Sequence, residues 1–168
     1  MPPLRTIAAM PDQPMQQYRG AVILCDHLDQ MLNGKWAIVG TFTSILVRTP
    51  VHRFSQGLAL YLRFQVEQTG RHPVAIRLLS RDAPTAPPIL QTAFEAEVAD
   101  VNSPTEIGAR LPPFSVRCPV DPATVKAGQQ VAVGFAIWVD VGGCALASTP
   151  LTVVFGGPLE PPRSEIQV

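Results

Sequence analysis

Cys25, Asp26 and His27 stand side by side, and Asp29 follows two residues later. A cysteine and a histidine can act as nucleophile and base, and aspartate with histidine can bind a metal ion. On an extended strand, neighbouring side chains point to opposite faces, so Cys25 and His27 share one side and Asp26 faces away. This spacing favours a strand that ends and enters a turn over a catalytic pair.

A turn signal follows this cluster directly. Asn33 and Gly34 are the residue types that best tolerate the positive φ angles of a tight hairpin turn. The carboxylate of Asp26 would then accept hydrogen bonds from backbone donors, such as those of the Asn33-Gly34 loop. We predict that Asp26, Asn33 and Gly34 structure a turn and carry no chemistry.

The remaining two histidines complete the candidates for metal or ligand contact. His52 and His72 stand beside arginines in predicted loops, and a site of three histidines requires these loops to meet His27 at one end of the domain. The ligand candidates are His27, Asp29, His52 and His72. No serine lies in a Gly-x-Ser-x-Gly elbow, and the glycine pair at 142–143 precedes no helix that would hold a phosphate. We expect no cofactor and no enzymatic activity.

Trp138 is the most informative aromatic side chain. It is out of phase with the apolar residues of its predicted strand, such as Phe135 and Ile137, so it faces away from the core. An exposed tryptophan among small residues makes a flat apolar patch typical of protein interfaces. The predicted interface residues are Trp138, Ala132, Gly134, Ala136 and Tyr61. The alternative is that the N-terminal arm or a loop of the same chain covers the tryptophan.

The composition favours association and argues against nucleic acid. The 168 residues include 13 basic and 13 acidic side chains, and charged residues make up 15%, against roughly 25% in a typical soluble domain. A neutral surface with few charges does little to repel copies of itself. Lys35 and Lys126 are the only lysines, and the arginines form no basic run that would bind phosphates. The expected partner is therefore this chain itself or another protein.

The cysteines and the chain ends indicate the compartment. Cys25, Cys118 and Cys144 are widely spaced and include no Cys-x-x-Cys pair, which predicts free thiols in a reducing environment. The sequence does not begin with a basic segment followed by an apolar stretch and a cleavage site, and nowhere do 18 apolar residues run together. We expect a cytoplasmic protein without a membrane span.

Alternating apolar residues define the elements that position these side chains. In the segment 57–67, a core face of five apolar residues alternates with a wetter face that carries Ala59 and Tyr61; the core residues are Leu58, Leu60, Leu62, Phe64 and Val66. Similar signals predict about eight strands, at 21–28, 36–47, 57–67, 73–81, 89–98, 107–120, 129–140 and 144–155. The two prolines at 112–113 push their strand to an edge or split it, and Asp121 before Pro122 predicts one helical turn.

Eight strands without a long amphipathic helix predict an all-β fold. Two antiparallel sheets packed as a β-sandwich bury the apolar faces that a single sheet would leave in water, and a small closed barrel is the alternative. Proline fixes φ and removes a hydrogen-bond donor, so the proline-rich ends read as extended segments. The predicted organisation is an N-terminal arm at 1–19, a β-sandwich at 20–155 and a C-terminal tail at 156–168.

Two hairpin segments resemble a known family. The first runs from Val22 through the Asn33-Gly34-Lys35 turn to Phe42: an apolar strand ending in Asp, a Gly-Lys turn and an aliphatic strand ending in Gly-x-Phe. The second consists of residues 135–140, the glycine pair at 142–143 and residues 146–154. Over residues 20–155 the chain resembles an uncharacterised bacterial family of small all-β proteins. The resemblance implies an immunoglobulin-like sandwich and brings no activity, cofactor or catalytic residue.

Three functions are compatible with these features. The first is a non-catalytic module for protein–protein contact, by self-assembly or by docking to a larger complex. The second is a small-ligand or carbohydrate binder that uses loops at one end of the sandwich, with contacts from Tyr61, Trp138, His52 and His72. The third is a metal-assisted hydrolase that uses His27, Asp29 and His52. The low charge and the small residues around Trp138 favour the first.

Overall fold

The computed structural model describes residues 18–157, which form an all-β fold of eleven strands. The strands are β1 (Arg19–Gln30), β2 (Trp36–Thr41), β3 (Ser44–Val47), β4 (Val51–Phe54), β5 (Ala59–Gln65), β6 (Gly70–Ser80), β7 (Leu90–Val98), β8 (Thr105–Arg110), β9 (Phe114–Arg117), β10 (Gln130–Val141) and β11 (Cys144–Gly156). The predicted all-β class is confirmed. The predicted arm and tail lie outside the described residues except at their innermost positions.

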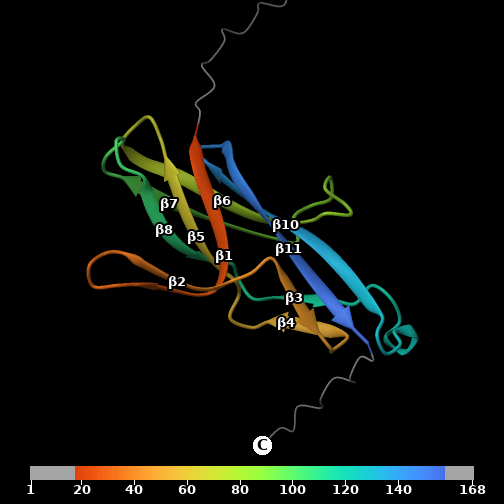
Figure 1. Cartoon of the computed structure of the whole chain (residues 1–168). Coiled ribbons are helices and arrows are strands. Elements are labelled where there is room, and N and C mark those ends of the chain that lie inside the picture. The colour runs from red at the N-terminus through yellow and green to blue at the C-terminus, as the bar shows by residue number, and fades with distance from the viewer. Residues whose placement is uncertain (1–17, 158–168) are drawn as a thin grey trace, which may run out of the picture.

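The strands form three sheets, one of them curled into a half-barrel (Figure 1). The four-stranded sheet has the order β2-β1-β5-β8, the five-stranded sheet has the order β3-β11-β10-β6-β7, and β4 pairs with β9 in a two-stranded sheet. Strand pairs are antiparallel except β3 and β11, which run parallel. The prediction of two purely antiparallel sheets is wrong in two respects, because there is a third sheet and because β3 pairs in parallel with β11.

Three segments explain why the chain has more strands than predicted. The segment 36–47 breaks at Phe42 and Thr43, where the chain leaves β2 in the four-stranded sheet and enters β3 beside β11. The segment 107–120 splits into β8 and β9 around Pro112 and Pro113, as predicted, because proline has no N–H to donate to a ladder. The short strand β4 was not predicted. The predicted helical turn is confirmed: Asp121 caps the 3₁₀ turn η1 (Pro122–Thr124), and its side chain accepts a hydrogen bond from the Ala123 amide.

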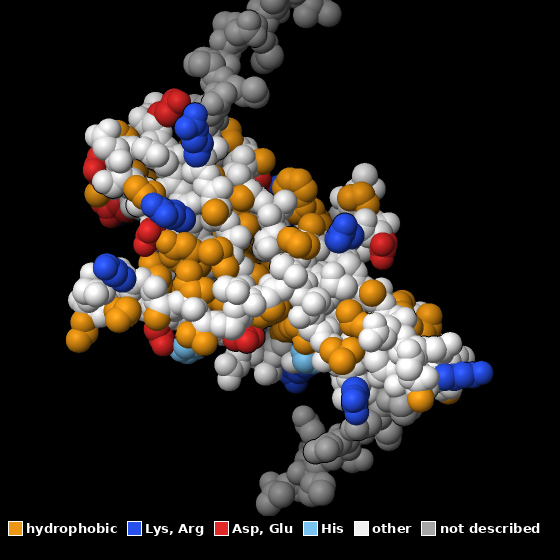
Figure 2. All heavy atoms as spheres, viewed as in Figure 1, with side chains coloured by type: hydrophobic (Ala, Val, Ile, Leu, Met, Phe, Trp, Pro, Cys, Tyr) orange, Lys and Arg blue, Asp and Glu red, His pale blue; other side chains and the backbone are white. Residues whose placement is uncertain are grey.

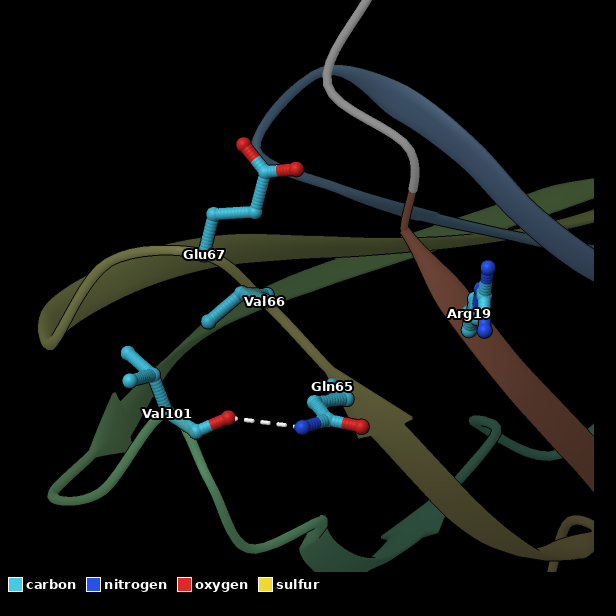
Figure 3. Close-up of a pocket in the computed structure, with 5 residues that line it drawn as sticks. All are labelled: Arg19, Gln65, Val66, Glu67 and Val101. Atoms are coloured by element: carbon cyan, nitrogen blue, oxygen red, sulfur yellow. Dashed lines mark hydrogen bonds between the residues drawn. The ribbon is translucent and has the colours of Figure 1, made fainter.

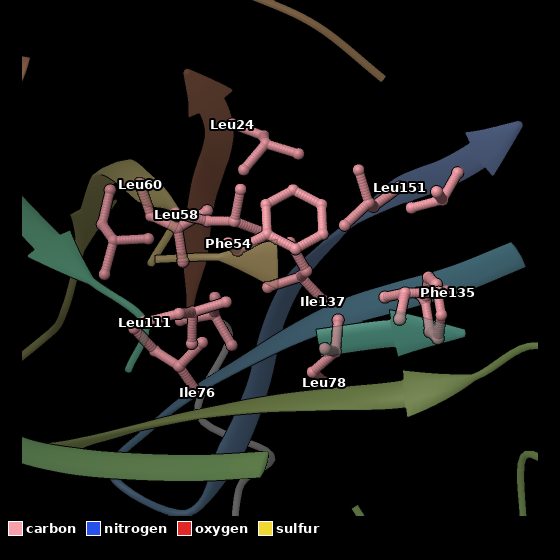
Figure 4. Packing of buried hydrophobic residues seen from close by; sticks show 14 of the residues in the cluster. Leu24, Phe54, Leu58, Leu60, Ile76, Leu78, Leu111, Phe135, Ile137 and Leu151 are labelled. Atoms are coloured by element: carbon pink, nitrogen blue, oxygen red, sulfur yellow. The ribbon is translucent and has the colours of Figure 1, made fainter. Parts of the chain in front are cut away.

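One apolar cluster joins the sheets (Figure 4). The predicted core face of β5 is confirmed, since Leu60 and Leu62 are fully buried and Phe64 is 1% exposed. The five-stranded sheet contributes fully buried side chains to the same cluster: Val74, Ile76, Leu78, Ile137, Val139, Leu151, Val153 and Phe155. Burying a side chain of this size contributes roughly 1.5–3 kcal/mol, so this shared core is what holds the sheets together.

The four-stranded sheet is curled, and the curl buries part of its second face. Ala59 and Tyr61 were predicted on the wetter face of β5, but they are 2% and 9% exposed. Leu28 and Trp36, from the hairpin of β1 and β2, lie against Gly108 on β8 and line a pocket with Ala59. The prediction of a wet face is wrong at these two residues, because the hairpin folds back over that side of β5.

Candidate functional site

Trp138 lies on the outer face of the five-stranded sheet. Its neighbours on β10, Ile137 and Val139, are fully buried in the core, whereas the Trp138 side chain is 39% exposed. Alternation along a strand puts successive side chains on opposite faces, which is the orientation that the sequence predicted for this tryptophan. A large aromatic side chain therefore stands on a surface that no described part of the chain covers completely.

Apolar side chains at both edges of the sheet, each one strand removed from a neighbour of β10, share this outer face. The register of β10, β11 and β3 places Leu46 on the same side as Ala132, and Leu46 is 60% exposed. Ile89, immediately before β7, donates its amide to the Leu78 carbonyl and is 47% exposed. We call this surface the Trp138 face; it consists of Leu46, Ile89, Ala132, Gly134, Ala136 and Trp138. Gly134 is partly covered by the aliphatic stem of Arg81, whose Cδ lies 3.1 Å from the place of a Cβ.

An ion pair lies beside the tryptophan. Arg77 is directly opposite Trp138 in the register of β6 and β10, and its Nη2 donates to Asp140 Oδ2 at 2.5 Å. The Asp140 side chain is only 15% exposed. Because Arg77 and Asp140 are each other's counterions, a partner that covers Trp138 does not leave either of them as a lone buried charge.

Tyr61 does not join the Trp138 face, although it was predicted as an interface residue. It belongs to β5 in the four-stranded sheet, and its hydroxyl forms a hydrogen bond with Glu106. Burial, and then the Glu106 carboxylate, raises the pKa of the Tyr61 phenol. Grouping Tyr61 with Trp138 was therefore wrong, because the two residues lie in different sheets.

The predicted turn residues are structural, and they act at two separate places. Asn33 Oδ1 accepts from the Lys35 amide at 3.1 Å, and Gly34 has a φ of 79°, so both residues shape the hairpin turn. Asp26 lies elsewhere: its carboxylate packs over Gly40 on β2, within the space that a Cβ would need. Asp26 thus fills the gap above a glycine, and the expectation that it joins the Asn33-Gly34 loop is not met.

The histidine candidates are dispersed. His27 Nε2 and Asp29 Oδ2 lie 2.7 Å apart on β1, and both side chains are exposed. His72, on β6, is within hydrogen-bond distance of the Gln68 carbonyl at 2.9 Å, and His52 belongs to the two-stranded sheet. Within residues 18–157, no three side chains of His, Cys, Asp or Glu are grouped so that they could hold a metal ion. The three-histidine arrangement is therefore not assembled here.

His52 has a distinct environment and gives a pH prediction. Its ring meets the edge of Phe54 at a centroid distance of 4.6 Å, Phe54 stacks on Phe114, and burial lowers the pKa of His52. The folded state then favours the neutral ring, so stability falls as the pH drops below about 6.5, the value of an unperturbed histidine.

We expect the urea midpoint to decrease between about pH 7.5 and about pH 5.5, and His52→Phe to flatten that decrease. An equally steep decrease in the variant would show that His52 does not carry the effect.

Cys25 is fully buried, whereas His27 is exposed. Its thiol donates to the Ala59 carbonyl at 3.6 Å, and burial, then the nearby Asp26, raises the pKa of this thiol. A raised pKa keeps the thiol protonated, which is the opposite of what a nucleophile needs. Cys25, Cys118 and Cys144 are free thiols, as predicted, and the first two are buried.

A shallow pocket of about 390 Å³ opens where β5 ends (Figure 3). Its lining residues are Arg19, Gln65, Val66, Glu67 and Val101. Gln65 Nε2 donates to the Val101 carbonyl at 2.7 Å, while the Glu67 carboxylate points away from that pair (Figure 3). The charged groups do not converge on one point, and none of the predicted ligand residues lines this pocket.

Neither the apolar tip of the β1–β2 hairpin nor the residues that join Trp138 from other strands were predicted from the sequence. Met31 and Leu32, at the tip, are 52% and 111% exposed. Apolar residues immediately before an Asn-Gly turn were the available signal. Leu46 and Ile89 could not be assigned to the Trp138 face without the strand order.

These features define an all-β protein with an exposed apolar sheet face and no converging set of catalytic groups among its described residues. The chain belongs to a family of unknown function, DUF6941, whose model matches residues 20–115. The resemblance to a family without an assigned activity is confirmed to that extent, and the last hairpin lies outside the matched range. A search of curated proteins finds no match. No helix in residues 18–157 is long and apolar enough to cross a membrane.

Proposed function

We propose that this protein is a non-catalytic module that associates with a second copy of itself through the Trp138 face. The observation that carries the proposal is the 39% exposure of Trp138 on a face that also exposes Leu46 and Ile89. Tryptophan is enriched among the interface residues that contribute most of the binding energy. Such residues lie near the centre of apolar patches that have polar rims.

Charge favours a second copy as the occupant of this face. The chain has 13 basic and 13 acidic side chains, so two copies do not repel each other through net charge. The Arg77–Asp140 pair is already neutralised within one chain. A two-fold contact brings the same surface of both copies together, so Trp138 of each copy can pack against the Trp138 face of the other.

The finer fold assignment is part of the same proposal. The two larger sheets share one apolar cluster, as the two layers of an immunoglobulin-like sandwich do. The curl of the four-stranded sheet and the two-stranded sheet of β4 and β9 are then additions to that layered plan. The low charge and the buried cysteines also support the expectation of a cytoplasmic location.

The mass of the purified protein in solution tests the proposed association. We expect a concentration-dependent oligomer by sedimentation, and Trp138→Ala should raise its dissociation constant about thirtyfold, since a dominant interface side chain contributes about 2 kcal/mol or more. Val51→Ala is the control, because Val51 is 40% exposed but lies on β4, which belongs to the separate two-stranded sheet. Equal dissociation constants for the two variants, or a monomer at every concentration, would contradict the proposal.

A further inference from the structure

The end of the molecule where β3 and β11 terminate carries cationic side chains without counterions. Four of them are exposed and form no ion pair with another residue of 18–157: Arg48, Arg53, Arg117 and Lys126. Residues 30–66 contain no acidic residue, and residues 107–130 contain only Asp121, whose carboxylate caps η1. In Figure 2, Lys and Arg side chains but no Asp or Glu side chain lie on the visible surface near the end of β11. This end therefore attracts an anionic group.

Two of the arginines lie together on the outer face of the two-stranded sheet. In the register of β4 and β9, Val51 is opposite Arg117, and Arg53 is opposite Ser115. Residues opposite each other point to the same side of a sheet, so these side chains share one face, and all of them are exposed. Arg53 and Arg117 are diagonal neighbours, which are about 7–8 Å apart and within reach of each other's long side chains. We call this surface the arginine face.

The C-terminal segment of the same chain leaves the fold at this end. β3 and β11 are parallel neighbours, and Val47 is paired with Phe155 where the two strands finish, so the chain leaves both strands in the same direction (Figure 1). Residues 48–50 then connect β3 to β4. The amide of Gly157, the last described residue, donates to the Gln129 carbonyl at 2.9 Å. The residues that follow Gly157 therefore start close to the strand that carries Val51 and Arg53.

The charge and length of the segment 158–168 suit the arginine face. Its charged side chains are Glu160, Arg163 and Glu165, so it is acidic overall. An extended chain spans at most about 3.3–3.6 Å per residue, so Glu160 can lie up to about 10 Å from Gly157 and Glu165 up to about 28 Å. By the same measure Val51 lies at most about 14 Å from Val47. Both glutamates are therefore within reach of the cations at this end.

The N-terminal segment is a poorer occupant. Tyr18 packs against Gly142, which follows β10, whereas Gly157 lies at the Gln130 end of that strand. The segment 1–17 therefore starts at the opposite end of the molecule. Its charged side chains, Arg5 and Asp12, also cancel.

We propose that the segment 158–168 binds across the arginine face of its own chain, with its glutamates paired to Arg48, Arg53 and Arg117. A short tether gives the segment a millimolar effective concentration, so it outcompetes a second copy at micromolar concentration. Exposed ion pairs are individually weak and are screened by salt, so the contact should open at high ionic strength. The contact uses the two-stranded sheet, so it is separate from the Trp138 face and should persist in Trp138→Ala.

A spin label on the segment tests this placement. The label is attached to Ser164→Cys in a Cys144→Ser background, since Cys25 and Cys118 are buried. We expect the amide signals of the arginine face to lose intensity in nuclear magnetic resonance spectra, and to recover it in about 1 M salt. They should also recover when Glu160→Gln and Glu165→Gln are combined. A loss that is absent, or equally large with and without the two glutamates, would overturn the proposal.

A mixed sample identifies whose segment occupies the face. Isotope-labelled chains without the spin label are mixed with spin-labelled chains that carry no isotope. We expect no loss of intensity in this sample, because the segment binds its own chain. A loss in the mixed sample would show that the segment of a second copy occupies the face, which would contradict the proposed contact.

A charge exchange supplies the final test. Arg53→Glu combined with Arg117→Glu should abolish the loss of intensity, and adding Glu160→Arg and Glu165→Arg should restore it, because the pairs then form with reversed sign. Lys35→Glu is the control, since Lys35 is an exposed cation at the β1–β2 turn that forms no ion pair among residues 18–157. Failure of the exchanged charges to restore the loss, in a variant whose dichroism spectrum matches the wild type, would overturn the proposal.

Discussion

Gly57→Ala is expected to destabilise the protein strongly, although it adds only one methyl group. Gly57 has a φ of 71°, and a Cβ at this position would overlap the carbonyl oxygen of Leu111, a backbone atom that cannot rotate away. Leu111 is itself held, because its amide donates to the Leu58 carbonyl at 2.9 Å. The left-handed conformation costs roughly 1–2 kcal/mol for a residue other than glycine, and the overlap adds to it, for a total of at least about 3 kcal/mol.

A second glycine with a left-handed φ separates the conformational cost from the cost of the steric overlap. Gly143 has a φ of 81°, and a Cβ there would meet nothing within 4 Å. Gly143→Ala should therefore cost only the conformational part, roughly 1–2 kcal/mol. Urea unfolding of both variants measures the difference. If the two lose the same stability, Gly57 does not abut the Leu111 backbone as described, and the junction between β5 and β8 is misplaced.

Ile137→Ala is expected to cost much more folding stability than Trp138→Ala, although the two residues are neighbours on β10. Ile137 is fully buried between the sheets, so its truncation leaves a cavity and should cost about 2–5 kcal/mol of folding stability. That loss corresponds to a fall in the thermal midpoint of about 5–20 °C for a domain of this size. Trp138→Ala removes a larger side chain from the outer face and should cost less than Ile137→Ala.

Calorimetry of the two variants at low protein concentration, where association is weakest, makes this comparison. The result also decides whether Trp138→Ala is a clean variant for the association experiment. A Trp138→Ala protein that loses more stability than Ile137→Ala would mean that the tryptophan belongs to the core and that the phase of β10 is reversed.

Much of the fold is predictable because local patterns determine it. The two-residue alternation of β5 and β10 identifies their core faces, and Leu62 and Ile137 are buried as that alternation requires. Pro112 and Pro113 end a strand because they lack an amide hydrogen. The Asn33-Gly34 turn and the Asp121 cap are short-range features whose chemistry is complete within a few residues.

The remaining features depend on contacts between distant segments. The change of sheet at Phe42 and Thr43 places β3 beside β11, more than a hundred residues later, and no nearby residue encodes that partner. The burial of Tyr61 results from the curl of the four-stranded sheet, which brings Trp36 over Gly108. A period-two pattern indicates which residues lie on each of the two faces of a strand. Whether other parts of the chain cover one face or both depends on the curvature of the sheet.

The candidate site divides in the same way. The outward orientation of Trp138 follows from its phase on β10, and Ala132, Gly134 and Ala136 share its face by the same alternation. The pairing of Arg77 with Asp140, by contrast, requires the register between β6 and β10. Leu46 and Ile89 reach this face only through the strand order, so the extent of the surface was not predictable from the sequence.

The most direct measurement follows the environment of Trp138 as copies associate. In a Trp36→Phe variant, Trp138 is the single tryptophan, and its fluorescence emission reports whether water surrounds the indole. If the Trp138 face is the contact between copies, the emission maximum shifts to shorter wavelength as protein concentration rises, in step with the increase in mass. A maximum that stays at the long wavelength of a hydrated indole while the mass increases would contradict it.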